Sequence, residues 1–256
     1  MQSLDQTERQ KIRLICLAAQ MVLENGGETY RVEKTAMRMA GGLGMRDVNV
    51  VAFPTSIFVN VDGRSRIRRI THRGTNTSRL ARINNVSRRV EHGELTPNEA
   101  EAELEAIAAD PGWHCVTLIV AYGISAASFS LLFGGTPGAL LCALLVGMLI
   151  QGIQPLFAHL AMGTLLFNFC GGFIGALLCQ LSALFSSAID VNAAIICAIM
   201  PLLTGLLMTT AVRDTLYGDL ISGIARAVEA LLLAACVALG VFVGLKTAAM
   251  MGGMPL

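Results

Sequence analysis

The chain has 256 residues, of which 54% are apolar and only 14% are charged. Soluble domains are typically about 45–50% apolar and about 25% charged, so this composition excludes a wholly soluble protein and indicates a membrane protein with a soluble part. The net charge of +1 favours no class of partner, but residues 1–114 hold 16 of the 19 Lys and Arg and 14 of the 18 Asp and Glu.

The change in charge near His114 predicts two domains. We expect residues 1–114 to form a small cytoplasmic α+β domain, and residues 115–256 to form a membrane α-helical bundle of five transmembrane helices. The opening sequence MQSLDQTERQ is polar and lacks the pattern of a signal peptide. The seven cysteines include no C-x-x-C pair and no His at ligand spacing, so we expect buried free thiols and no metal site.

The first domain shows helix and strand patterns in alternation. Apolar spacing, together with glycine stops and a capping box at Thr96–Glu99, predicts four helices: Asp5–Asn25, Glu28–Ala40, Ser78–His92 and Thr96–Ala109. Alternation and a hairpin signal at Asp62–Gly63 predict three strands: Asp47–Phe53, Ser56–Val61 and Arg64–Ile70. No Walker A, G-x-S-x-G or H-E-x-x-H motif occurs. We therefore predict no catalytic residue and no cofactor.

The second domain contains apolar runs that are long enough to cross a bilayer, which requires about 20 residues. The predicted spans are Cys115–Phe133, Pro137–Gln154, Leu160–Phe185, Val191–Val212 and about Gly223–Leu245. With the Lys- and Arg-rich domain in the cytoplasm, the loop from Arg213 to Asp219 also faces inward. We expect a multi-pass protein of the cell inner membrane.

Two features within the spans are candidates for contact with a solute. Asn168 lies deep in the third span, where a polar side chain either holds helices together or contacts a solute. Pro201 lies near the middle of the fourth span, and Gly205 follows at i+4. Proline removes a backbone donor and clashes with an earlier carbonyl, so we expect a kink or a break there. Such breaks mark substrate sites in transporters, and a simple packing kink is the alternative.

Charged residues return between the last two spans, where they are costly unless they have a function. Arg213, Asp214, Asp219, Arg226 and Glu229 are the only Arg, Asp or Glu after residue 190. Helical spacing places Asp219, Ser222, Arg226 and Glu229 on one face. The alternative is that these charges only end two helices at the lipid headgroups.

The two arginines of this segment suit a carboxylate ligand, because a guanidinium can bind a carboxylate through two hydrogen bonds. At rest, Asp214, Asp219 or Glu229 can serve as their partners. The same acids can instead bind an amino group or carry a coupling proton. The pattern thus predicts a small carboxylate-bearing substrate.

The string RDTLYGDLISGIARAVEA at Arg213–Ala230 resembles the signature R-D-x3-G-D-x2-S-G-x2-R-x2-E-A of the threonine/serine exporter (ThrE) family. The segment Asn25–Met45 resembles the opening G-x-E-x-x-R-V-E segment of that family, and the order of a soluble domain and then five spans matches its YjjP-type members. Thr204 and Thr210 stand where the family often has Pro and Asn, so the specificity implied by the resemblance can differ at Thr210.

The resemblance implies an exporter subunit for threonine, serine or a dicarboxylate such as succinate. It also implies a separate small YjjB-type membrane subunit, a homo-oligomer, or both, and it gives no reason to expect nucleic acid. Two other hypotheses stay open. One is a membrane-anchored enzyme with a hydrolase-like soluble domain, and the other is a membrane-tethered sensor.

Overall fold

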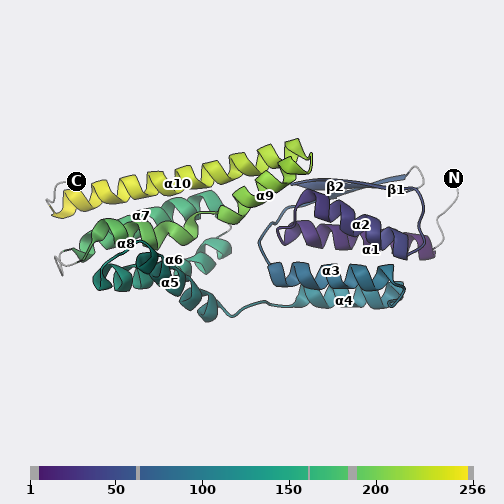
Figure 1. The fold of residues 1–256 in the computed structure, drawn as a ribbon, viewed down its shortest axis with the longest axis horizontal. Coiled ribbons are helices and arrows are strands. Elements are labelled where there is room, and N and C mark those ends of the chain that lie inside the picture. The colour runs from purple at the N-terminus through teal and green to yellow at the C-terminus, as the bar shows by residue number, and fades with distance from the viewer. Residues whose placement is uncertain (1–5, 62–63, 161, 184–188, 253–256) are drawn as a thin grey trace. The chain divides into compact units, whose positions relative to one another are not determined.

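The computed structural model describes residues 6–61, 64–160, 162–183 and 189–252 (Figure 1). Contacts between residues divide the chain into two compact units, each built from two stretches of sequence. The first unit comprises Met1–Asp110 and Leu207–Ala227, and the second comprises Pro111–Leu206 and Val228–Leu256. The first unit therefore contains the segment that carries Arg213 and Arg226 together with the N-terminal residues.

The first unit combines a small sheet with helices. Its elements are α1 (Gln6–Glu24), α2 (Thr29–Gly42), β1 (Val48–Phe53), β2 (Ser56–Val61), β3 (Arg64–Arg69), α3 (Thr77–Glu91), α4 (Pro97–Ala109), most of α9 (Gly205–Leu216) and the first turns of α10 (Leu220–Gly252). The predicted bounds hold to within two residues for the elements up to β3, and the predicted capping box of Thr96 and Glu99 is present. The predicted Asp62–Gly63 hairpin lies outside the described residues.

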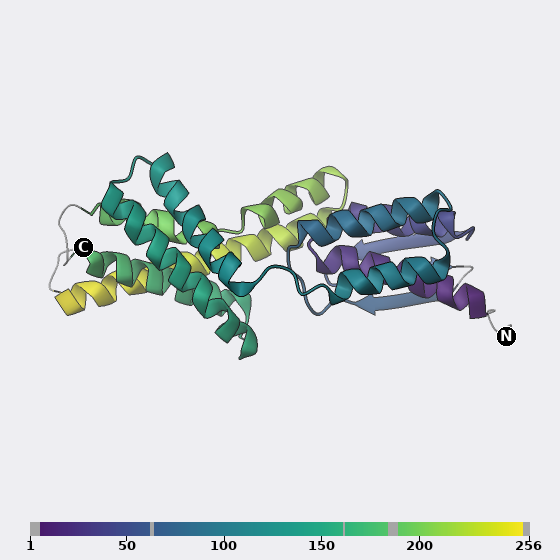
Figure 2. The same ribbon diagram turned by 90° about the horizontal axis from the view of Figure 1, so that it is seen from below.

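The three strands form an antiparallel sheet in the order β1-β2-β3. Alternation along β2 buries Ile57, Val59 and Val61 on the face covered by helices and leaves Phe58 more exposed on the other face. Helices α1 and α2 pack on the buried face of the sheet, and α3 and α4 pack against α1 and α2 as a further layer (Figures 1 and 2).

Helix α1 forms the centre of this unit. Leu14, Ile15 and Leu23 are fully buried, because α1 has the sheet on one side and other helices on the opposite side. Leu14 and Ala18 share one helical face and are buried, and Ile15 and Ala19 beside them are buried as well, so more than one face of α1 is covered. Burial on several sides makes α1 a rigid support for the turn that follows it.

The second unit is built from apolar helices. It contains α5 (Cys115–Leu132), α6 (Pro137–His159), α7 (Thr164–Ser182), α8 (Val191–Ile199), the 3-10 turn η1 (Met200–Leu202) and the rest of α10. Among the described residues, four helices are long and apolar enough to cross a membrane, or five if the broken pair Val191–Leu202 and Gly205–Leu216 counts as one span. Only 22–33% of each such apolar window is buried within the protein, so most of its side chains remain available to lipid.

Glycines bring α7 and α10 into close contact. A Cβ at Gly240 would lie 2.1 Å from the carbonyl oxygen of Phe169, and one at Gly172 would lie 2.5 Å from that of Val237. Only glycine permits this approach of the two backbones.

Several predicted span boundaries are wrong. Helix α9 continues past Val212 to Leu216, and α10 runs from Leu220 to Gly252 rather than from about Gly223 to Leu245. Helix α6 does not stop at Gln154 but continues through Pro155 to His159, and α7 begins at Thr164 rather than at Leu160. The edge-to-face contact of Phe157 with Phe167, with ring centroids 5.6 Å apart, stabilises the extra turn. The break expected around Pro201 is confirmed, because helical structure ends at Leu202 and begins again at Gly205.

Candidate functional site

The site is built on the turn between α9 and α10. Gly218 adopts φ +94°, a conformation that favours glycine, and it reverses the chain between the two helices. A Cβ at Gly223 would lie 2.1 Å from Thr215 Oγ1 and 2.9 Å from the Ala211 carbonyl oxygen. The two helices therefore lie against each other closely enough for their charged side chains to meet.

The centre of the site is a buried ion pair between these two helices. Arg226 Nε lies 3.0 Å from Asp214 Oδ2, and the side chains are 4% and 0% exposed. Arg226 also donates a hydrogen bond of 2.8 Å to the carbonyl oxygen of Gly27, and a longer one of 3.4 Å to the Thr210 hydroxyl. Removing both charges from water is costly, so each depends on the other and on these polar contacts.

The two aspartates of the segment bind the first residue of α2. Asp214 Oδ1 accepts a hydrogen bond of 3.1 Å from the Thr29 backbone N–H, and Asp219 Oδ2 accepts one of 2.8 Å from the Thr29 hydroxyl. The residue before it, Glu28, makes no side-chain cap of its own. The N-terminus of a helix carries unpaired N–H groups and partial positive charge, so Asp214 caps α2 from a distant part of the chain.

A second, more exposed ion pair lies beside the first. Arg213 Nη1 lies 2.8 Å from Glu28 Oε1, and Arg31 Nη1 lies 3.2 Å from the other oxygen of Glu28. Burial alone would raise the pKa of Glu28, but its backbone N–H, Arg213 and Arg31 together hold that pKa below its ordinary value. Tyr30 stacks on Tyr217 with ring centroids 4.0 Å apart.

Two glycines shape the N-terminal side of the site. Gly26 adopts φ +87°, and a Cβ there would lie 2.9 Å from the Gly74 carbonyl oxygen. At Gly27 a Cβ would lie 2.5 Å from a methyl carbon of Val22, so a larger residue would displace the carbonyl that binds Arg226. We name the residues Gly27, Glu28, Thr29, Arg213, Asp214, Asp219 and Arg226 the signature cluster.

The structure brings together most of the residues predicted from the C-terminal signature. Arg213, Asp214, Asp219 and Arg226 belong to the cluster, Thr210 contacts Arg226, and Ser222 is 2% exposed in the first turn of α10. Of the three acids considered as partners for the arginines, Asp214 forms the ion pair with Arg226.

Three predicted site residues belong to the second unit: Glu229, Pro201 and Asn168. Asn168 is 3% exposed, and its side-chain nitrogen has no hydrogen-bond partner among the described residues. Gly171, one turn further along α7, packs against Leu202, so Asn168 lies near the helix break that follows Pro201. Asn168 is therefore a buried polar side chain within the apolar unit.

The N-terminal half of the signature cluster was not predicted as a binding site. Gly27, Glu28 and Thr29 lie in the segment Asn25–Met45 that resembles the family, but no binding role was predicted for any of them. One signal was present in the sequence: the segments Asn25–Met45 and Arg213–Ala230 both resemble the family, both contain glycines, and both carry charged residues that can pair. Within the described residues, no group of three or more His, Cys, Asp or Glu could hold a metal ion.

The chain matches known proteins along nearly its whole length. The ThrE family, described as "Putative threonine/serine exporter", matches residues 13–248. A "Probable threonine/serine exporter" of Mycobacterium tuberculosis is 25% identical over 249 residues, which cover 93% of this chain but 46% of that protein. A "Probable succinate transporter subunit YjjP" of Klebsiella aerogenes is also 25% identical, over 93% of this chain and 94% of that protein.

No solved structure matches the chain at a significant level. The family match covers far more than half of the sequence, and it includes both segments that meet in the signature cluster. The chain therefore belongs to the threonine/serine exporter family.

Proposed function

We propose that this chain is a subunit of an exporter of small carboxylate-bearing metabolites, either amino acids such as threonine and serine or a dicarboxylate such as succinate. In this proposal the protein lies in the inner membrane with five spans, its N-terminal α+β domain is cytoplasmic, and it acts as a transporter rather than as an enzyme. The relatives named above support the general class, because one is named as an amino-acid exporter and the other as a succinate transporter subunit.

The observation that carries the proposal is the buried pair of Arg226 and Asp214. A guanidinium that pairs with an aspartate and donates to two neutral oxygens resembles a carboxylate site that is already occupied by a side chain of the same protein. A substrate carboxylate can replace Asp214 at Arg226 without leaving a buried positive charge unpaired, which a neutral solute cannot do.

Exchange at Arg226 also affects α2. When a substrate displaces Asp214, this aspartate keeps its bond to the Thr29 N–H or takes up a proton. If Asp214 keeps this bond, α2 stays capped. If Asp214 is protonated instead, the cap of α2 is weakened, and solute binding is coupled to the N-terminal domain and to proton uptake. Asn168 and the break after Pro201 are proposed to contact the solute further along its path.

The partner is also part of the proposal. The relative with YjjP in its name is called a subunit, and this chain covers nearly all of it, whereas it covers about half of the mycobacterial relative. We propose that a second small membrane protein or further copies of this chain complete the transport path. Efflux measured with and without a co-expressed candidate partner distinguishes a two-protein transporter from one built of copies of this chain alone.

The test is efflux of radiolabelled succinate and threonine from loaded cells that express the chain with its candidate partner. Arg226→Gln should abolish efflux while the protein still inserts into the membrane, and Arg46→Gln removes one exposed positive charge elsewhere as the matched control. Wild-type efflux by the Arg226 variant would remove the signature cluster from the transport path. Hydrolysis of a metabolite by the purified chain would favour the enzyme hypothesis instead.

A further inference from the structure

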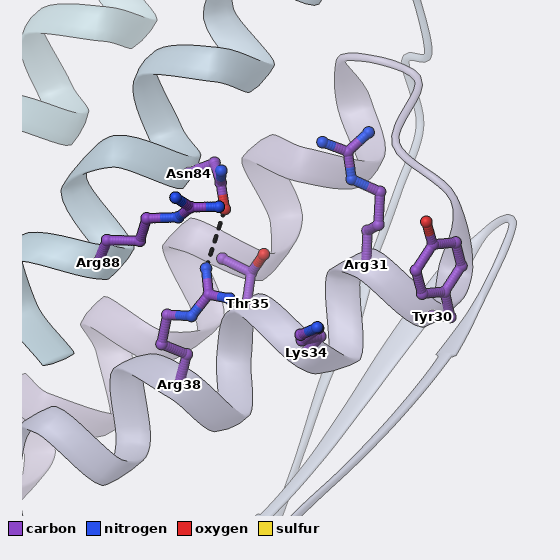
Figure 3. Close-up of a pocket in the computed structure, with 7 residues that line it drawn as sticks. All are labelled: Tyr30, Arg31, Lys34, Thr35, Arg38, Asn84 and Arg88. Carbon is purple, nitrogen blue, oxygen red and sulfur yellow. Dashed lines mark hydrogen bonds between the residues drawn. The ribbon is translucent and has the colours of Figure 1, made fainter.

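A basic pocket lies between α2 and α3, apart from the signature cluster. We define it by its lining residues, which are Tyr30, Arg31, Lys34, Thr35, Arg38, Asn84 and Arg88 (Figure 3). All of them belong to the first unit, and four of the seven carry a positive charge. None of these residues was predicted from the sequence to bind a ligand.

The positive charges of the pocket exceed the acids that face them. Arg38 pairs with Glu91 at 3.0 Å, and Arg31 shares Glu28 with Arg213. Within the described part of the chain, no ion pair or side-chain hydrogen bond is found for Lys34 or Arg88. Like charges that converge on one hollow repel each other and attract an anion.

Neutral donors complete the pocket. Asn84 Oδ1 accepts a hydrogen bond of 2.9 Å from Arg38, which leaves the amide N–H2 of Asn84 as a donor. Figure 3 shows Arg88 and Arg38 on either side of this amide, with Thr35 close by. Arg38 is held by Asn84 and Glu91 and its side chain is only 15% exposed, so this part of the site is fixed before any ligand arrives.

The size and charge of the pocket select the ligand. Its volume is about 160 Å³. This is enough for one phosphoryl group with a few further atoms. A phosphate ester carries about −1.5 to −2 charges and three acceptor oxygens, which suits several cations better than a single carboxylate does.

We propose that the basic pocket binds a phosphate-bearing anion, with Lys34 and Arg88 as its main charged contacts and Arg38, Thr35 and Asn84 as positioned donors. The site does not depend on the transport proposal, because it uses none of the residues assigned to the exported carboxylate. A soluble phosphate ester and a phosphorylated lipid headgroup both supply this chemistry, and the experiment distinguishes them.

The experiment measures binding to the purified full chain by calorimetry at constant ionic strength, with inorganic phosphate as the probe. The wild-type chain should bind phosphate, and the double variant Lys34→Gln/Arg88→Gln should bind it at least ten-fold more weakly. The control Arg46→Gln/Arg69→Gln removes two exposed charges outside the pocket and should bind as the wild type does. Because all four side chains are exposed, unchanged melting temperatures should show that each variant is folded.

A second arm uses nanodiscs with or without phosphatidylinositol 4-phosphate. If phosphate binds the wild-type chain in nanodiscs without this lipid but not in nanodiscs that contain it, the pocket takes a lipid headgroup. If phosphate binds equally in the two kinds of nanodisc, the ligand is a soluble phosphate ester. Equal loss of affinity in the pocket and control variants, or no binding of either probe, would overturn the proposal.

Discussion

Two groups of charged residues adjoin α2, one at its N-terminus and one between α2 and α3, and they are organised in opposite ways. In the signature cluster, two arginines meet three acids, and the central pair is removed from water. In the basic pocket, the described residues offer four cations only Glu91 and a share of Glu28, and Lys34 and Arg88 face solvent. Balanced buried charges hold segments together until a ligand replaces one partner, whereas unbalanced exposed charges are available to a ligand at once.

The largest effect should come from breaking the buried pair. Asp214→Ala leaves Arg226 charged and buried, and it also removes the cap of α2, so it should cost about 3–5 kcal/mol of folding free energy. Denaturant unfolding of the purified chain in detergent measures this cost. Arg46→Gln serves as the control, and a loss below about 1 kcal/mol would mean that the pair is accessible to water.

A smaller effect should come from the close contact that brings α9 and α10 together. Gly223→Ala places a Cβ against Thr215 Oγ1 and the Ala211 carbonyl, and the resulting overpacking should cost about 1–3 kcal/mol. Gly205→Ala is the matched control, because a Cβ there meets nothing within 4 Å. Equal stability of the two variants in the same unfolding assay would show that the helices separate easily.

Two glutamates near the cluster should respond to pH in opposite directions. The pKa of Glu28 is lowered in the folded state, so Glu28 adds stability above its unfolded pKa of about 4.3, and this is lost as pH falls through the folded value. The pKa of Glu33 is raised, first by burial and also by Asp219, against a hydrogen bond from the Ala52 N–H. Its contribution is therefore present at low pH and is lost as pH rises through the folded value.

The measurement is the melting temperature of Glu28→Gln and Glu33→Gln across the acid range. Glu28→Gln should destabilise the chain at neutral pH, with a difference from wild type that shrinks on acidification. For Glu33→Gln, the melting temperature relative to wild type should be higher at neutral pH than at acid pH. The same trend in both variants would contradict the assigned environments.

The smallest effect on stability should come from the basic pocket. Lys34→Gln/Arg88→Gln removes two exposed side chains for which the described residues offer no ionic partner, so the free energy of unfolding should change by no more than about 0.5 kcal/mol per substitution. Relief of repulsion would make the change slightly favourable. A loss of several kcal/mol would mean that these cations hold α2 and α3 together and are not free to bind a ligand.

Local patterns predicted most of the fold. The bounds of β2, the capping box at Thr96 and the break after Pro201 all follow from short-range chemistry. The predicted end of α6 was wrong, because the helix continues through Pro155 to His159, and Phe157 in this extra turn contacts Phe167 of α7. That contact joins separate elements, and it is not visible in the spacing of one segment.

The same distinction applies to the site. The return of charged residues between two apolar runs singled out Arg213, Asp214 and Arg226, and the structure pairs Arg226 with Asp214. That pattern could not show that Thr29 and Gly27, almost 200 residues earlier, supply a backbone N–H and a carbonyl to them. Backbone groups carry no sequence signature, and a cap supplied by a distant carboxylate is set by tertiary structure alone.

The central claim is that Arg226 binds the carboxylate of the exported solute and that Asp214 is its partner at rest. Efflux and stability measured together on Asp214→Asn/Arg226→Gln test it most directly, because this double variant removes both charges and leaves neither buried alone. We predict that the double variant regains most of the stability lost by Arg226→Gln and still exports no succinate or threonine. Recovery of efflux along with stability would contradict the claim and would show that the pair only holds the fold.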